Sequence, residues 1–270
     1  MFDVGVNLLS KQFRKDRDAV LSRARSAGVK RQIVISGSVG ETRAAIDMGA
    51  DTGFGCTAGV HPHHAAEVDQ DWLPHLLALA QHPLVCAIGE TGLDFNRNFS
   101  PPETQLAVFT AQIKLAQQVN KPLYLHDRES DGELMRSLEA AGPLPPVLVH
   151  CFTGTAQELE NYLAAGFYIG ITGWVTDPKR GAELRELVPR IPLNRLMIET
   201  DAPYLRPANV PPDWLAQQGL SARYKRRCEP ALLPYIAAAI AQLYRVAPAE
   251  IAAATSANAL HFFKASARSL

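Results

Sequence analysis

Short apolar runs recur eight times along this chain of 270 residues, and a stretch with helical spacing separates most runs from the next. The runs do not alternate with polar residues, which is the pattern of strands buried on both faces. The unbroken βαβα order predicts right-handed crossovers and a parallel sheet, and eight units favour a closed TIM (β/α)8 barrel over an open sheet. The runs lie near residues 2–6, 32–36, 56–60, 85–89, 122–125, 146–149, 168–172 and 195–199.

The length of the chain fits one such barrel, whose usual size is roughly 250 residues. We therefore expect a single TIM-barrel hydrolase domain over residues 1–270. Residues 104–119 show the spacing of an amphipathic helix between two of the runs, with Leu106, Phe109, Ile113 and Ala116 on one face. After the last run, a long proline-rich connection at 202–230 leads into extra C-terminal helices after about 231, at 231–244 and 248–263.

The composition excludes several classes of protein. Lysine plus arginine equals aspartate plus glutamate at 27 each, so no overall positive field attracts a nucleic acid or a membrane, and any polyanion must be held by a local patch. The four cysteines are scattered without a C-x-x-C pair, which indicates reduced thiols rather than a disulfide framework or a structural zinc site. The chain opens on MFDVGVN without a basic, apolar leader, and no run reaches the ~18 apolar residues of a membrane span. We expect a cytoplasmic protein with no membrane partner.

Four side chains of the type that binds metals stand at the ends of four different apolar runs. They are Glu90 after VCAIG, His126 after PLYL, His150 after PVLV and Asp201 after LMIET. Because the barrel carries the C-terminal ends of its strands to one rim, these residues can meet although they are far apart in sequence. A cation requires such convergence, and Glu90 would be costly to bury without a cation or a hydrogen-bond partner. The sequence therefore predicts a metal site at the C-terminal rim.

Further candidates lie beside these four. His61 ends the third run in AGVHPHH and should face the same rim, where we expect it to contact the substrate or its phosphate. His63 and His64 lie further along the loop, and for them an ordinary loop role is the stronger interpretation. Arg128 follows His126 by two residues, so its guanidinium is placed either to grip a phosphate or to form a surface salt bridge with a nearby acidic residue.

A basic cluster occupies the long connection before the C-terminal helices. It consists of Arg223, Tyr224, Lys225, Arg226 and Arg227. Such a cluster can follow a phosphate backbone while the tyrosine stacks on a base, and solvated loop charge is the alternative. We retain Arg223, Tyr224, Arg226 and Arg227 as candidate nucleic-acid contacts.

Several motifs resemble the signature blocks of the TatD family of metal-dependent deoxyribonucleases. They are GETGLDF at 89–95, LHDR at 125–128, HCFTGT at 150–155, YIGITGW at 168–174 and ETDAPYL at 199–205, and the likeness extends from residue 2 to about residue 263. The resemblance implies a TIM-barrel hydrolase that removes nucleotides from single strands in the 3′ to 5′ direction with a divalent cation, usually magnesium, and a role in DNA repair. By position, Glu90, His126, His150 and Asp201 match the metal ligands of the family, and His61 and Arg128 match rim residues associated with the site.

The first strand departs from the pattern of many relatives. They carry D-x-H-x-H there, which supplies two histidine ligands, whereas this chain reads Asp3-Val4-Gly5-Val6-Asn7. Gly5 has no side chain and Asn7 offers only an amide oxygen, so the metal position served by this strand should be weakened or empty. The number of metals therefore stays open at this point.

The sequence thus predicts a metal-dependent nuclease, acting on single-stranded DNA or RNA as a monomer. We expect Glu90, His126 and His150 to hold the main cation, Asp201 to ligate it or to accept a proton from water, and Arg128 and His61 to orient the phosphate. Mg²⁺ is the expected cation, and Mn²⁺ or Zn²⁺ also suits this set of ligands. Two other readings stay open: a metal-dependent esterase or amidase such as an aminoacyl-tRNA deacylase, and a nucleic-acid-binding protein whose catalytic site has decayed.

Overall fold

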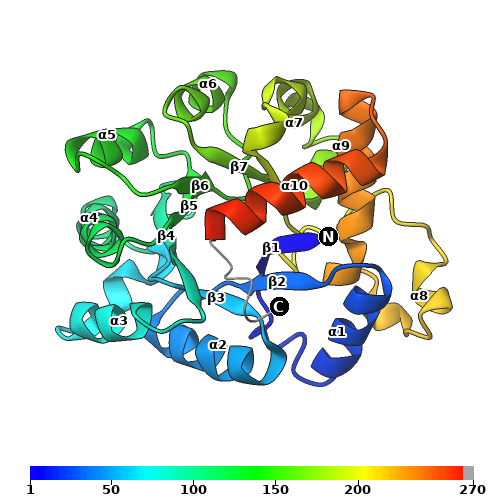
Figure 1. The fold of residues 1–270 in the computed structure, drawn as a ribbon, viewed down its shortest axis with the longest axis horizontal. Helices are drawn as coiled ribbons and strands as arrows, with labels where there is room; N and C mark the ends of the chain where they lie inside the picture. The colour runs from blue at the N-terminus through cyan, green and yellow to red at the C-terminus, as the bar shows by residue number, and fades with distance from the viewer. Residues whose placement is uncertain (264–270) are drawn as a thin grey trace. The chain divides into compact units, whose positions relative to one another are not determined.

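The computed structural model describes residues 1–263, which form eight parallel strands in one sheet, in the order β1 to β8 (Figure 1). Val6, at the end of β1, and Ala202, after β8, form a parallel bridge that joins the beginning of the strand series to its end. The fold is therefore a TIM barrel, as the alternating pattern predicts. The strands are β1 (Phe2–Val6), β2 (Arg31–Val34), β3 (Gly55–Ala58), β4 (Val85–Asp94), β5 (Leu123–Arg128), β6 (Val147–Val149), β7 (Tyr168–Ile171) and β8 (Leu196–Ile198).

Helices connect the strands and complete the chain. The α-helices are α1 (Arg17–Ser26), α2 (Val39–Thr52), α3 (Trp72–Ala80), α4 (Pro102–Val119), α5 (Glu133–Ala140), α6 (Ala156–Ala164), α7 (Ala182–Leu187), α8 (Trp214–Gln217), α9 (Leu233–Tyr244) and α10 (Pro248–Phe263). Short 3-10 helices are η1 (Pro62–Glu67), η2 (Gly173–Thr176), η3 (Val188–Arg190), η4 (Leu193–Arg195), η5 (Ala222–Tyr224) and η6 (Pro230–Leu232). The predicted helices at 104–119, 231–244 and 248–263 are thus present.

The chain divides into two compact units. The first unit comprises residues 1–32 and 170–259, and the second comprises residues 33–169 and 260–263. The expectation of a single domain stays a prediction.

The second unit contains strands β3 to β6, whose apolar side chains are almost entirely buried, as the sequence pattern indicates. Helices α2 to α6 lie on the outer side of these strands (Figure 1). Helix α4 shows why: Val108, Phe109 and Ile113 share one buried face at helical spacing. The helix begins with a proline in its first turn and ends at Asn120 in the left-handed conformation, a common helix stop.

Strand β4 is longer than the apolar run predicts. It continues beyond Glu90 to Asp94, and β5 likewise continues beyond His126 to Arg128. Both predicted ligands therefore lie within strands and not after them. The extension is possible because the two strands pair along their polar ends, with Asp94 in register with Arg128, while the register shifts between Ile88 and Thr91. Because a polar side chain after an apolar run usually marks the end of a buried strand, the sequence does not predict that β4 and β5 continue.

The first unit contains the beginning and most of the last third of the chain. Its β1 and β8 lie beside each other, and helices α9 and α10 follow the long connection. Among residues 1–263 no single helix is long and apolar enough to cross a membrane, although α9 with η6 and α10 together pass that test across a bend of 108°. Leu233, Ile236 and Ile240 on α9 are fully buried within the protein.

Candidate metal centre

Consecutive strands of the second unit deliver their polar side chains to one place. His61 follows β3 and caps η1, Glu90 lies in the middle of β4, His126 lies in β5, and His150 comes directly after β6. Parallel strands in a barrel place such residues on one rim. The structure therefore brings together four of the side chains that the sequence singles out.

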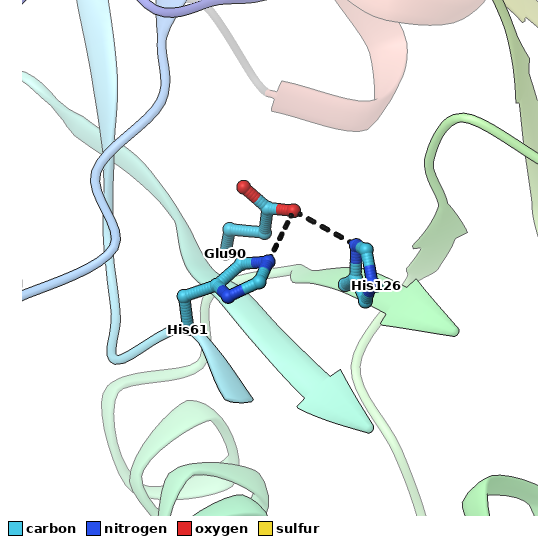
Figure 2. Close-up of side chains that lie close together, drawn as sticks. All are labelled: His61, Glu90 and His126. Atoms are coloured by element: carbon cyan, nitrogen blue, oxygen red, sulfur yellow. Dashed lines mark hydrogen bonds and ion pairs between the residues drawn. The ribbon is translucent and has the colours of Figure 1, made fainter. Parts of the chain in front are cut away.

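The centre of the group is a single carboxylate oxygen, Oε1 of Glu90. His150 Nε2 lies 2.8 Å from it, His126 Nδ1 lies 3.1 Å from it, and His61 Nε2 lies 3.2 Å from it. Figure 2 shows the Glu90 carboxylate between the rings of His61 and His126, with both interactions dashed. His150 and Glu90 are buried, so little water competes for these contacts.

The surroundings keep the Glu90 carboxyl ionised. Burial by itself raises its pKa, but the neighbouring His61 and His150 and the hydrogen bonds from His126 and His150 outweigh burial, and the net pKa lies well below the usual value. A buried carboxylate with its charge retained at neutral pH is a strong ligand for a hard cation.

The position of the proton on the His61 ring follows from its contact with the backbone. The candidate ligand atoms of His61, Glu90 and His126 lie within 4.8 Å of one another, close enough to share a cation. However, His61 Nδ1 accepts the backbone N–H of His63 at 3.0 Å, so the neutral ring carries its proton on Nε2, which faces Glu90. Burial lowers the pKa of His61 to about 4, against the attraction of Glu90, so the ring is neutral at pH 7. His61 is therefore placed as a hydrogen-bond donor and not as a ligand.

His126 stands between two carboxylates. Its Nδ1 faces Glu90, and its Nε2 faces Asp94 Oδ2 at 3.3 Å. Burial lowers the pKa of this ring, but the hydrogen bonds to Asp94 and Glu90 more than compensate, and the net pKa is raised. A ring that binds a metal through one nitrogen usually donates the other N–H to a carboxylate, and Asp94 is placed to receive it.

The residues fit a divalent cation. A carboxylate oxygen offers about two lone-pair sites, so Glu90 Oε1 cannot accept strong hydrogen bonds from three rings together. One lone pair of Glu90 Oε1 can accept the N–H of His61. The second lone pair can bind a cation together with His126 Nδ1 and His150 Nε2. This set of one oxygen and two nitrogens suits Mg²⁺, Mn²⁺ and Zn²⁺.

Asp201 and the first strand belong to the first unit. Asp201 Oδ1 accepts a hydrogen bond from Asn7 Nδ2 at 2.8 Å, and its backbone N–H donates to the carbonyl of Gly5 at 3.0 Å. Asn7 thus uses its amide to hold the Asp201 carboxylate. The roles of Asp201 as a ligand or as a proton acceptor stay predictions.

The predicted phosphate-binding residues occupy different environments. Arg128 ends β5 with a half-buried side chain. Arg223 and Arg226 are exposed, and Tyr224 packs beneath the guanidinium of Arg223. Arg227 does not suit the predicted nucleic-acid contact, because its side chain is buried and bound to the carboxylates of Asp16 and Glu229.

The sequence does not identify His63 and Asp94 as residues of the centre. His63, interpreted as an ordinary loop residue, has its Nε2 2.7 Å from Asp94 Oδ2, and Asp94 also receives the backbone N–H of Arg97 at 2.8 Å. The hydrogen bonds from His126, His63 and the backbone of Arg97 hold the pKa of Asp94 well below its usual range despite burial. The sequence does contain a signal, since Asp94 follows Glu90 by four residues and even spacing in a strand places side chains on one face.

Known proteins of similar sequence cover the whole length of the chain. A family model described as TatD related DNase matches residues 2–264. A protein of Erwinia tasmaniensis named "3'-5' ssDNA/RNA exonuclease TatD" is 46% identical over 266 residues, covering 97% of this chain and 99% of the relative. A protein of the same name from Shigella flexneri serotype 5b is 44% identical, covering 97% of this chain and 98% of the relative.

Solved structures give the same result. A hydrolase of the TatD family from Entamoeba histolytica superposes with a TM-score of 0.87 at 27% identity, covering 98% of each chain. YjjV, a TatD homologue from Escherichia coli, superposes with a TM-score of 0.85 at 27% identity and the same coverage. Together with the family match over residues 2–264, these similarities show that the chain belongs to the TatD related DNase family.

Proposed function

We propose that the protein is a metal-dependent nuclease that removes nucleotides from the 3′ ends of single-stranded DNA and, as a second substrate, RNA. The observation that carries the proposal is the convergence of His126 and His150 on the buried carboxylate of Glu90. Membership of the TatD related DNase family and relatives named as 3′-5′ exonucleases of single-stranded DNA and RNA support the same reaction.

Glu90, His126 and His150 hold the cation in this proposal, and Asp201 contributes a further ligand or accepts a proton from the attacking water. A divalent cation bound there supplies two effects, a lower pKa for water and neutralisation of charge on the phosphoryl oxygens. The retained charge of Glu90 and the two imidazoles make the set suitable for Mg²⁺, with Mn²⁺ and Zn²⁺ as substitutes.

The remaining side chains position the reacting groups. His61 presents its Nε2–H toward the centre, so it donates either to Glu90 or to a phosphate oxygen of the bound strand. Arg128 lies two residues beyond His126 in β5, and its guanidinium can grip a phosphate with two parallel hydrogen bonds. Asp94 fixes the orientation of His126 and so acts through that ring.

Cleavage of end-labelled single strands tests the proposal. With Mg²⁺, the protein should release the label of a 3′-labelled strand at once and shorten a 5′-labelled strand stepwise. Glu90→Ala should reduce the rate at least about a hundredfold, because the ligand set loses the carboxylate on which His126 and His150 converge. Glu139→Ala, which removes an exposed carboxylate from α5, is the matched control and should keep full activity.

Other outcomes identify the alternatives. Hydrolysis of aminoacyl-tRNA by a protein that leaves DNA intact would identify a metal-dependent esterase. Binding of single strands without nucleotide release in Mg²⁺ or Mn²⁺ would identify a binding protein with a decayed site. Equal cleavage by Glu90→Ala and its parent would refute the proposed centre. Removal of metal by EDTA, followed by addition of Mg²⁺, Mn²⁺ or Zn²⁺ singly, identifies the cation that restores the rate.

A further inference from the structure

Phe99 is the most exposed large hydrophobic side chain among residues 1–263, with 67% of its surface in contact with solvent. It belongs to the segment at 95–100 that links β4 to α4. A single exposed apolar side chain is common on protein surfaces and carries no argument alone. The position of this one relative to the metal centre gives it significance.

The side chain of His63 lies between the Phe99 ring and the centre around Glu90. The Phe99 ring meets His63 edge to face, with ring centroids 4.7 Å apart and an angle of 81° between the planes. His63 in turn lies 4.2 Å from the ring of His61 and donates to or accepts from Asp94 at 2.7 Å. All four residues belong to the second unit.

The segment that carries Phe99 is held at several points. The backbone N–H of Phe95 donates to the carbonyl of Arg128 at 3.0 Å, and the backbone N–H of Arg97 donates to Asp94 Oδ1 at 2.8 Å. At the other end, Ser100 Oγ donates to the carbonyl of His63 at 3.0 Å and its own carbonyl accepts from Gln105 Nε2 at 2.7 Å. The ring is therefore presented from a fixed backbone, so little conformational entropy is lost when a partner binds it.

We propose that Phe99, supported by His63, is a stacking platform for an unpaired base of the strand whose phosphate enters the metal centre. The inference rests on the proposed nuclease function and names a subsite for its substrate. Flat aromatic rings hold single strands because every base has a π-face, and this contact tolerates any sequence. Exposed Arg97 and half-buried Arg128 flank the segment with positive charge, which suits the phosphates of a strand rather than an apolar protein surface.

The platform also accounts for a preference for single strands. A base inside a duplex is already stacked on both faces and paired, so it must be freed before it can lie on Phe99, and that release costs a few kcal/mol. A base at an unpaired 3′ end has a free face. The geometry thus favours strands whose end is unpaired.

Steady-state kinetics of Phe99→Ala test the platform. The variant should raise KM for a single-stranded oligonucleotide about tenfold and leave kcat within about twofold, because stacking contributes to binding and not to bond cleavage. Phe99→Trp should restore KM. On an oligonucleotide whose 3′-terminal units are abasic, Phe99→Ala and the parent should have equal KM, because no base remains to stack. Leu260→Ala, which removes another exposed apolar side chain, is the matched control and should change nothing.

A binding measurement gives a second readout without catalysis. In the Glu90→Ala background, an oligonucleotide with 2-aminopurine near its 3′ end should lose fluorescence on binding, because stacking quenches this base. The Phe99→Ala change should remove that quenching. Equal melting temperatures for Phe99→Ala and its parent would show that the variant is folded.

The outcomes separate the two proposals. If the parent degrades strands but Phe99→Ala keeps the KM of the parent and the 2-aminopurine quenching, the platform is wrong and the nuclease function stands. If the parent degrades no strand, the nuclease function is wrong, and the quenching experiment alone decides whether a base stacks on Phe99. Loss of self-association in Phe99→Ala with unchanged KM would instead identify the ring as an interface between two copies of the chain.

Discussion

Asp94 contacts His126, His63 and the backbone of Arg97 with one carboxylate, so it fixes two rings of the centre at once. Replacing Asp94 with Asn keeps the shape of the side chain, but a neutral amide then takes the place of the charged carboxylate that accepts a hydrogen bond from His126. We expect Asp94→Asn to weaken metal binding roughly 10- to 100-fold, the usual effect of losing a carboxylate behind a metal-bound histidine. Isothermal titration with Mn²⁺ measures this directly, without reference to activity.

Measurements at saturating metal distinguish a role of Asp94 in positioning His126 from a defect in folding. At high Mn²⁺ concentration Asp94→Asn should recover most of its kcat, and Asp94→Glu should bind metal more tightly than Asp94→Asn because it restores the charge. An unchanged Mn²⁺ affinity in Asp94→Asn would show that Asp94 does not support the metal ligand. A melting temperature well below that of the parent would assign the loss to folding.

The sequence reveals some residues of the centre and hides others for a physical reason. Glu90, His126 and His150 each follow a purely apolar run, and a polar group placed there needs a partner, so the sequence alone indicates that they converge. His63 gives no such signal. Its contact with Asp94 depends on how η1 folds back over the end of β4, which is a tertiary property that no local pattern encodes.

At the scale of elements, the connection between β8 and α9 contains a part held by ion pairs, at Arg227 and Glu229, and an exposed part, at Arg226. Arg227 bonds Asp16 through both terminal nitrogens, at 2.9 and 2.7 Å, and Glu229 at 2.6 Å, and Arg23 bonds Glu229 at 2.8 Å. This buried network fastens the end of the connection to α1 and to the segment before it. Arg226, its neighbour, is exposed.

These two adjacent arginines should therefore behave differently. Arg227→Ala should lower the free energy of unfolding by about 3 kcal/mol, because it removes the buried guanidinium that bonds half-buried Asp16 and leaves buried Glu229 with Arg23 alone. Arg226→Ala should leave stability within about 0.5 kcal/mol and should weaken binding of single strands, with a shallower dependence on salt. Urea unfolding and fluorescence anisotropy at several salt concentrations measure the two effects. The opposite pattern would show that Arg227, and not Arg226, faces the strand.

The sequence predicts where elements occur better than where they end. The apolar runs at 85–89 and 122–125 predict strands that end before Glu90 and His126. Strands β4 and β5 continue because each polar end pairs with the other, through the register of Asp94 with Arg128. Similarly, the sequence shows Arg223 to Arg227 as one basic cluster, but only the structure shows that Arg227 is buried and bonds Asp16, which is distant in sequence, and its neighbour Glu229.

At the scale of the whole molecule, the sequence pattern predicts the TIM barrel because the alternation of buried strands and amphipathic helices is a global property that survives errors at single boundaries.

A buried carboxyl group affects the stability of the whole molecule. Asp3 is fully buried on β1, where its carboxylate accepts hydrogen bonds from the backbone and hydroxyl of Thr200 at 2.9 and 2.6 Å. Burial raises the pKa of Asp3 to about 7, although those hydrogen bonds oppose the shift.

The stability of the protein should therefore fall as pH rises through this range. Between the pKa of an unfolded aspartate, about 3.9, and about 7, the folded state binds a proton at Asp3 that the unfolded state has lost, so deprotonation favours unfolding. In EDTA, the free energy of unfolding should be larger at pH 5.5 than at pH 8, by up to a few kcal/mol from this group. Asp3→Asn, whose amide can donate to the Thr200 hydroxyl, should flatten the profile.

Thermal unfolding of Asp3→Asn and of Asp18→Asn, an exposed control on α1, at pH 5.5 and pH 8 measures this difference. The control should retain the pH dependence of the parent. An Asp3→Asn profile that parallels the parent would mean that Asp3 is not the group that titrates.

The hydrogen bonds around Glu90 have a consequence for which substitutions the centre tolerates. His61, His63, Asp94, His126 and His150 all come from one continuous stretch in the second unit, whereas Gly5 and Asn7 belong to the first unit. Among residues 1–263, the hydrogen bonds described for these rings join residues of the second unit. The centre around Glu90 can therefore keep its geometry when the side chains at positions 5 and 7 are replaced.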